Sequence, residues 1–387
     1  MRLNADPLHV LRARTSAKWS SFPDDVLPMF VAEMDFPLAP AISTALHQAI
    51  ERGDTGYVNP RGSGVPEAFV DYTKQAWAWA PDTDAMGITT DVSVVIVESL
   101  RRLISPGQGV IITPPVYPPF FDLLPEGGAA VVEVPLRDDS SSYALDLDGI
   151  DRALHEGARG VLLCNPHNPV GLVHSREDLV QLSQIVARHD GFVISDEIHG
   201  PLIHDGHEFT PYLTASAEAR EHGIAAHSAS KAFNLAGLKC ALFVAESDRM
   251  TSLITSLPEE VGYRAGLFGA IASRAGFADG RDWLTGTLTA IEQNLDLLQE
   301  LLKRHLPMVK LRRPNASFLA WIDMSNLGWG DDPAKYALDA ARVALSHGPL
   351  FGPQGAGYAR INIACAPDMI TEAIARLSRA DAAFTET

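Results

Sequence analysis

The feature that most constrains the fold is a series of short apolar runs between residues 90 and 246, separated by segments with helical spacing. Most runs are nearly continuous in apolar residues, as expected of parallel strands that are covered by helices on both faces. Several strand–helix–strand units in series indicate a doubly wound α/β sheet. We predict a mostly parallel, seven-stranded sheet built from Val92–Val97, Val110–Thr113, Ala130–Val134, Gly160–Cys164, Phe192–Ser195, Ile224–Ser228 and Cys240–Ala245.

One helical segment between these runs can be interpreted in detail. Ser175 can cap a helix N-terminus, Asp178 stands where a capping-box acid would, and Asp190-Gly191 ends the helix just before the next strand. Its inner face is formed by Leu179, Leu182, Ile185 and Val186. The segment therefore completes a strand–helix–strand unit.

A different pattern begins after residue 280. Apolar residues recur at alternating spacings of four and three, which predicts one long helix with a single apolar stripe. Two strand-like runs, Phe318–Ile322 and Ala359–Ile363, and a helical tail after Asp368 follow it. This pattern indicates a second, smaller α/β domain, and on the pattern alone the first fifty residues could belong to either domain. We predict a large domain over residues 46–284 and a smaller α/β domain made of residues 1–45 and 285–387.

Composition and charge exclude several classes of protein. The 387-residue chain has a formal net charge of −17, which argues against general binding to nucleic acid or to anionic membranes. No apolar stretch is long enough for a membrane span, and the N-terminal residues lack the apolar core of a signal peptide. The odd number of cysteines, three, fits reduced thiols. We expect a cytoplasmic enzyme that does not act on nucleic acid or membranes.

Polar residues follow three of the predicted strands. Asn168 lies in a loop after one strand, Asp196 directly follows another, and Lys231 lies shortly after a third. Ligands of open parallel sheets bind beyond the carboxyl ends of the strands, so these side chains are candidates for a site. Arg360 stands beside a strand of the second domain. Taken singly, each is more typical of a turn, a helix cap or a solvated surface residue.

Asn168, Asp196, Lys231 and Arg360, together with the residues that flank them, occur in an order along the chain that resembles that of the pyridoxal-phosphate enzymes of the aspartate aminotransferase superfamily (fold type I, class I/II). More narrowly, they resemble the MalY/PatB-type cystathionine β-lyases, which are C–S lyases. The resemblance runs from about residue 6 to the C-terminus. The stretches that carry it are Met34–Phe36, Gly56-Tyr57, Thr113–Tyr117, Asn165–Gly171, Ser195–His199, Ser228–Lys239, Ser317–Trp321 and Arg360–Asn362.

The resemblance implies pyridoxal 5′-phosphate (PLP) as cofactor and gives roles to the residues around its ring. Lys231 would form the Schiff base with the PLP aldehyde and then act as the base for the substrate Cα proton. Asp196 would keep the pyridine nitrogen protonated, and Asn168 would bond the ring oxygen. Tyr117 would stack on the ring, and His199 would lie beside it, although a packing role for His199 is equally open.

The other implied roles concern the phosphate and the substrate. Ser228 and Lys239 would bind the phosphate, together with backbone N–H groups at Val95, Ile96 and Val97. Arg360 would clamp the substrate α-carboxylate with two hydrogen bonds. Tyr57 would reach the phosphate of a partner subunit and could assist the chemistry, which implies a homodimer with shared active sites.

The reaction that the resemblance implies is β-elimination from an S-substituted cysteine. L-Cystathionine would give homocysteine, pyruvate and ammonia, a step of methionine biosynthesis. The alternative is an aminotransferase of the same class, because both reactions start from the same bond to PLP and the same loss of the Cα proton. Which S-substituted cysteine is the substrate stays open, as does binding of a regulatory partner protein.

Three other motifs that would indicate a different function match the sequence less well. Ser228–Lys231 also fits the S-x-x-K pattern of serine acyl-enzymes, but the accompanying S-D-N and K-T-G strings do not occur. Gly107–Gly109 lacks the third glycine of a dinucleotide fingerprint. The histidines at 199, 204 and 207 do not have a zinc-binding spacing, so we predict no metal.

Overall fold

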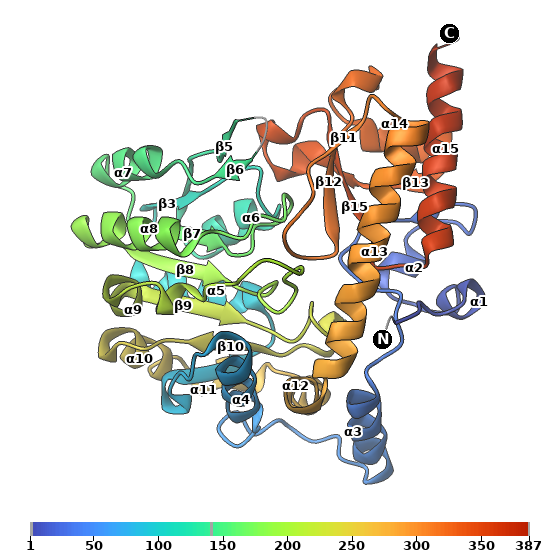
Figure 1. Cartoon of the computed structure of the whole chain (residues 1–387). Helices are drawn as coiled ribbons and strands as arrows, with labels where there is room; N and C mark the ends of the chain where they lie inside the picture. The colour runs from blue at the N-terminus through green and yellow to red at the C-terminus, as the bar shows by residue number, and fades with distance from the viewer. Residues whose placement is uncertain (1–2, 140–141, 386–387) are drawn as a thin grey trace.

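The computed structural model describes residues 3–139 and 142–385. Within these residues, seven strands form one sheet in the order β2-β10-β9-β8-β7-β3-β4 (Figure 1). β10 is antiparallel to both of its neighbours and all other pairs are parallel, so the predicted mostly parallel sheet is confirmed. The strands are β2 (Met86–Thr89), β3 (Gly109–Ile112), β4 (Ala130–Glu133), β7 (Gly160–Cys164), β8 (Phe192–Asp196), β9 (Gly223–His227) and β10 (Ala241–Val244).

One of the seven strand predictions is wrong. The run Val92–Val97 is the start of helix α5 (Val92–Leu103), and the seventh strand is β2, just before it. All of Val95, Ile96 and Val97 are buried, because α5 packs against β8, β9 and β10. A helix that is buried on most of its surface lacks a polar face, so its apolar run is indistinguishable from that of a central strand.

Helices cover both faces of this sheet. Val110 and Ile112 of β3 pack among residues of α5, α6 and α10, whereas Ile111 between them packs on the opposite face. The helices of the first face are α5, α6 (Phe120–Glu126), α10 (Asp248–Thr255) and α11 (Glu259–Tyr263). Those of the opposite face are α4 (Val65–Trp77), α7 (Leu147–His155), α8 (Arg176–Arg188), α9 (Ala217–His222) and α12 (Leu267–Asp279).

Helix α8 begins where its capping residue predicts. The Ser175 hydroxyl accepts a hydrogen bond from the Asp178 backbone N–H at 3.0 Å. The inner residues Leu179, Leu182 and Val186 are fully buried against the sheet. Periodicity and cap together therefore define this element correctly.

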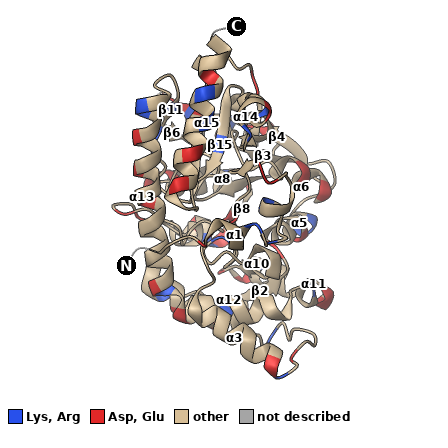
Figure 2. Ribbon diagram, turned by 90° about the vertical axis from the view of Figure 1, so that its right-hand side faces the viewer, with Lys and Arg blue, Asp and Glu red and all other residues tan. Residues whose placement is uncertain are grey.

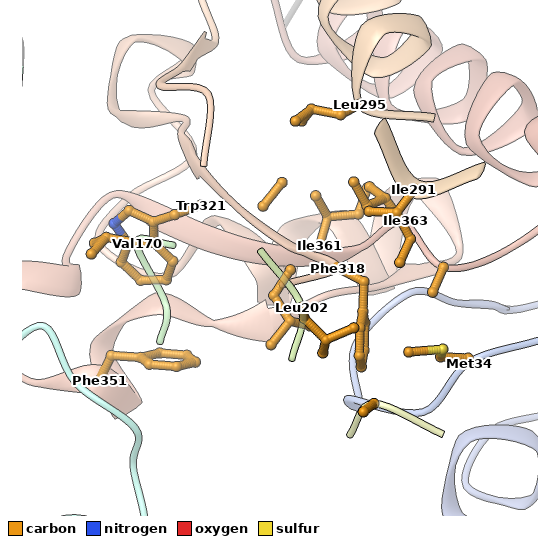
Figure 3. Packing of buried hydrophobic residues seen from close by; sticks show 14 of the residues in the cluster. Met34, Val170, Leu202, Ile291, Leu295, Phe318, Trp321, Phe351, Ile361 and Ile363 are labelled. Atoms are coloured by element: carbon orange, nitrogen blue, oxygen red, sulfur yellow. The ribbon is translucent and has the colours of Figure 1, made fainter. Parts of the chain in front are cut away.

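A second, antiparallel sheet lies beside the first and has the strand order β11-β12-β15-β14. The long helix α13 (Arg281–His305) and the C-terminal helix α15 (Pro367–Thr385) pack beside it. Figure 3 shows Ile361 and Ile363 between Leu295 of α13 on one side and Leu202 on the other. The strands are β11 (Lys310–Leu311), β12 (Leu319–Asp323), β14 (Ser346–His347) and β15 (Tyr358–Asn362), and α14 (Pro333–Ala341) packs near them.

The N-terminal residues join the second sheet region. β1 (Leu27–Pro28) pairs in parallel with β13 (Val343–Ala344). Both predicted domain boundaries fall inside helices, residue 45 within α3 (Pro40–Glu51) and residue 284 within α13. Because α3 packs on α12 of the large sheet, the chain passes between the two parts before residue 40. The division at residues 46 and 285 stays a prediction.

The surface of the second domain carries charges of both signs. In Figure 2 the charged residues of α13 and α15 appear as separate turns of either sign. No helix in the described part of the chain has the length and hydrophobicity needed to cross a membrane. The remaining helices and strands are α1 (Leu8–Leu11), α2 (Ala17–Ser20), β5 (Arg137–Asp138) and β6 (Tyr143–Ala144), with 3₁₀ turns at Thr83–Ala85, Tyr212–Thr214, Ala236–Leu238, Ser325–Leu327, Gly348–Phe351 and Pro353–Gly355.

Candidate active site

A cavity of about 380 Å³ lies beyond the carboxyl ends of β7, β8 and β9, where ligands of parallel sheets bind. The structure brings nine of the predicted site residues to its wall although they come from six separate stretches of the chain. These are Ile96, Tyr117, Asn168, Asp196, His199, Ser228, Lys231, Lys239 and Arg360. Val95, Val97 and Tyr57 do not line it.

Lys231 lies near the middle of this set. Its Nζ donates a hydrogen bond to the backbone carbonyl of Ala32 at 3.1 Å. Burial, and then the positive charge of Arg360, lower the pKa of Lys231 to about 8. About a tenth of this amine is therefore uncharged at pH 7, far more than for an ordinary lysine, and the uncharged form is the one that acts as a nucleophile or a proton acceptor.

Asp196 is the last residue of β8 and its side chain is almost fully buried. Its Oδ1 accepts a hydrogen bond from the Ile198 N–H at 3.1 Å. Burial raises the pKa of Asp196 to about 7, with the nearby Glu197 acting in the same direction. A carboxylate in such surroundings gains most from a cationic partner, and a protonated pyridine nitrogen is one.

Small polar groups gather at one end of the cavity. The Ser230 N–H and the Ser228 hydroxyl are linked at 3.1 Å, and Ser228 also donates to the Cys240 carbonyl at 2.6 Å. Lys239 pairs with Asp91 at 3.1 Å, directly before the first turn of α5. Hydroxyls, an ammonium and a helix N-terminus form an end that suits a phosphate.

The backbone donors at this end differ from those predicted. The N–H of Val95 bonds the Asp91 carbonyl at 3.1 Å, and the N–H groups of Ile96 and Val97 lie further inside the helix, where each bonds the carbonyl four residues earlier. The free N–H groups of the first turn are those of Val92 and Ser93, which both line the cavity. The prediction for Val95–Val97 is corrected to Val92 and Ser93, because the helix starts earlier than the sequence pattern indicated.

Arg360 reaches the cavity from β15 of the second sheet. Its guanidinium donates to Asn168 Oδ1 at 2.9 Å, to Ser346 Oγ at 3.1 Å and to the Phe30 carbonyl at 3.3 Å. Burial lowers the pKa of Arg360 to about 10, so the group stays charged at neutral pH. Its Nε is buried and has no hydrogen-bond partner among the described residues. The guanidinium as a whole lines the cavity and can bind a carboxylate.

His199 and Tyr117 complete the walls. Burial and the charges of Lys231 and Arg360 lower the pKa of His199 to about 3, so this imidazole is neutral. Its Nδ1 is buried without a hydrogen-bond partner in the described residues. Burial also raises the pKa of the Tyr117 phenol. Neither side chain carries charge, which suits contact with an aromatic ring.

The sequence patterns did not identify one component, the segment of residues 30–33, which directly precedes the stretch Met34–Phe36. Asn362 donates to the carbonyls of Val31 at 2.7 Å and of Glu33 at 2.6 Å, on either side of the Ala32 carbonyl that Lys231 contacts. These contacts use backbone carbonyls, which any residue type supplies. Only the asparagine after Arg360, in the stretch Arg360–Asn362, offered a signal for them.

Residues 38–377 match the family model of aminotransferase class I and II. The chain belongs to this family.

Family members of known name align over nearly the whole chain. Cystathionine beta-lyase PatB of Bacillus subtilis is 30% identical over 386 residues, which cover 98% of this chain and 100% of PatB. Cystathionine beta-lyase of Corynebacterium glutamicum is 31% identical over 376 residues, covering 96% of this chain and 98% of the relative. The structure of cystalysin from Treponema denticola, which contains a PLP cofactor, has a TM-score of 0.90 at 26% identity and covers 95% of this chain and 96% of cystalysin. The resemblance predicted from the motifs is confirmed.

The residues of this class I and II chain fit PLP. The buried Asp196 carboxylate suits the pyridine nitrogen, and the group of Ser228, Ser230, Lys239 and the α5 N-terminus suits the phosphate. Lys231 lines the same cavity and has a pKa of about 8. The cavity thus supplies a donor or acceptor for each polar part of the cofactor.

Proposed function

We propose that this chain is a PLP-dependent C–S β-lyase that cleaves L-cystathionine or a related S-substituted cysteine to a thiol, pyruvate and ammonia. The observation that carries the proposal is the placement of Lys231, Asp196 and Arg360 around one cavity. The names of the relatives that are at least 30% identical support the lyase over the aminotransferase.

Bound PLP would supply an aldehyde that bonds amines and a ring that accepts the electron pair released at the substrate Cα. Asp196 would hold the proton on the ring nitrogen, where a negative neighbour favours it. Arg360 would bind the α-carboxylate through its guanidinium, which lines the cavity. Lys231, with its lowered pKa, would take the Cα proton.

Departure of sulfur from Cβ would then need little help. A thiol has a pKa near about 8.5, so a thiolate leaves without strong acid assistance. Among the described residues Arg360 is the one arginine that lines the cavity. A substrate with a second carboxylate close to Cα would find no second arginine among the described residues that line the cavity, which argues against an aspartate-type aminotransferase.

We also propose a homodimer in which Tyr57 acts in the site of the partner subunit. Tyr57 is 91% exposed, far more than is usual for a large aromatic side chain, and a second cavity of about 720 Å³ opens near Asn59, Arg61 and Tyr263. Mixing Tyr57→Ala dimers with Lys231→Ala dimers under conditions of subunit exchange should restore activity, because one site of each hybrid carries neither change. Two inactive variants that stay inactive when mixed would contradict a shared site.

We place the reaction in the cytoplasm and, through homocysteine, in methionine biosynthesis. The support for a reducing compartment is that Cys164, Cys240 and Cys365 are all buried and unpaired.

The proposed activity is tested by thiol release from L-cystathionine with the PLP-loaded protein. We expect homocysteine formation by the wild type and none by Lys231→Ala. Borohydride reduction followed by peptide mass spectrometry should place the cofactor on Lys231. A cofactor adduct on another lysine, or no thiol from any S-substituted cysteine, would overturn the proposal.

A further inference from the structure

Directly behind Asp196 lies a fully buried carboxylate that the proposed chemistry does not use. Glu197 follows Asp196 at the end of β8, and its side chain has no exposed surface. Its Oε1 accepts hydrogen bonds from the Ser195 hydroxyl at 2.9 Å and the Tyr212 N–H at 2.7 Å, with the Asn165 amide at 3.4 Å. Three donors thus converge on one oxygen of this carboxylate, and its negative charge acts on Asp196.

The other oxygen, Oε2, faces His227 at the end of β9. Oε2 lies 3.1 Å from His227 Nε2, within ion-pair distance, and neither atom has a hydrogen-bond partner in residues 3–139 and 142–385. The imidazole is enclosed by Phe69, Trp77 and Trp79, whose ring centroids lie 4.7–5.8 Å away. Aromatic walls keep water away, so the negative charge of Glu197 is poorly screened.

Glu197 and Asp196 approach the strand end from opposite faces. Val193 and Ala225 pack on the face of the sheet where Glu197 and His227 lie, whereas Ile194 packs on the face of α5 and the cavity. The two carboxylates are therefore successive residues separated by the backbone of the sheet. The charge of one acts on the other, and Glu197 adds to the rise of the Asp196 pKa.

We propose, on the basis of the proposed function, that Glu197 with its partner His227 is a positioning residue for Asp196, and that its buried negative charge strengthens the hold of Asp196 on the proton of the cofactor ring nitrogen. A second negative charge makes loss of that proton less favourable, because deprotonation would leave two uncompensated carboxylates side by side. The titratable groups that interact with Asp196 from the surrounding elements are Glu197, Lys231, Tyr117 and Cys164.

The test uses 4′-deoxypyridoxine 5′-phosphate, which keeps the ring nitrogen and the phosphate but has no aldehyde to react with Lys231. Its dissociation constant is measured against pH by tryptophan fluorescence in the full chain freed of PLP. Binding of the protonated ring requires ionised Asp196, so affinity should fall on the acid side with a midpoint near the Asp196 pKa of about 7. Asp196→Asn should not show this loss of affinity at acid pH. Comparison with this variant therefore separates the titration of Asp196 from the titration of the phosphate.

Glu197→Gln keeps the shape and the acceptor oxygen but removes the charge, and should move the acid midpoint down by about one pH unit. His227→Gln leaves Glu197 charged with a weaker partner and should move the midpoint up. If Glu197 and His227 had a purely structural role, the acid midpoint would shift in the same direction in both variants or would not shift at all. Asp35→Asn is the matched control, because Asp35 is another fully buried carboxylate, paired with Lys18 at 2.8 Å and outside the cavity.

The control should lower thermal stability and leave the midpoint unchanged. An unchanged or raised midpoint in Glu197→Gln would overturn the inference. If that variant does not fold, His227→Gln decides, and a midpoint at or below that of the wild type would overturn it. Failure of the wild type to bind the probe would instead contradict the proposed function, so the two failures are distinguishable.

Discussion

Replacing Asp196 with asparagine should abolish most activity and yet stabilise the cofactor-free protein above pH 7. Asparagine has the same shape, and its carbonyl oxygen can accept the Ile198 N–H that now bonds Oδ1 at 3.1 Å. It cannot be ionised, so the cost of a buried charge disappears. Function and stability therefore oppose each other at this position.

The magnitude follows from the pKa. Burial raises the pKa of Asp196 from 3.8 to about 7, so the folded state binds this proton more tightly than the unfolded state does. The wild type therefore loses stability as pH rises from about 4 to about 7, and the loss is complete above pH 7. A difference of about three pKa units at 1.36 kcal/mol per unit corresponds to up to about 4 kcal/mol. Asp196→Asn should not show this loss.

Urea unfolding of the cofactor-free wild type and of Asp196→Asn, at equal protein concentration and at pH 5, 6, 7 and 8, measures the difference. We expect the variant to gain about 3 kcal/mol relative to the wild type between pH 5 and pH 8. With PLP bound, its turnover should fall on the order of 10²- to 10³-fold, as for loss of a preorganised charge partner. A stability difference between the two proteins that is the same at pH 5 and pH 8 would show that the pKa of Asp196 is not raised by folding.

Three further predictions concern the rest of the cavity. Arg360→Lys keeps the charge but loses one of the two hydrogen bonds to the substrate carboxylate. The transition state should lose about 1.5–3 kcal/mol of stabilisation, so kcat/KM should fall roughly 10- to 150-fold. A fall in kcat/KM of less than about twofold would exclude the two-bond contact with the carboxylate. Ser93→Pro removes an N–H at a helix position that tolerates proline, and cofactor affinity should fall with little change in Tm; unchanged affinity by fluorescence titration would show that this N–H does not bind the phosphate. Attachment of PLP to Lys231, followed by absorbance, should accelerate as pH rises and level off near pH 8, since the neutral amine reacts; a pH-independent rate would contradict the lowered pKa.

The central sheet was largely predictable because its strands are buried on both faces. Six of the seven apolar runs are strands within a few residues of the predicted bounds. The seventh run was assigned wrongly because α5 is covered by the sheet and by other helices, so that its residues are as apolar as those of a buried strand. The true seventh strand, β2, lies at the sheet edge and has few large apolar residues. Burial, rather than secondary structure, determines how apolar a segment is.

The site was predictable where chemistry requires a particular side chain. Lys231, Asp196 and Arg360 each supply a functional group that no other residue type replaces in that role, and the structure places all three on one cavity. The contributions of Ala32 and Ser93 are made by backbone groups, which leave no mark on the residue type. The roles of Tyr57 and His199 stay predictions, since one is on the surface of this chain and the other makes no hydrogen bond that would define its task.

The β-lyase activity is measured by counting the pyruvate molecules formed per active site from L-cystathionine in the absence of any keto acid. A β-lyase regenerates its cofactor in every cycle, so we expect many pyruvate molecules per site, with homocysteine and ammonia in equal amounts. An aminotransferase would stop after converting one substrate molecule per site, because its cofactor keeps the amino group. No pyruvate, together with turnover that depends on added 2-oxoglutarate, would contradict the account.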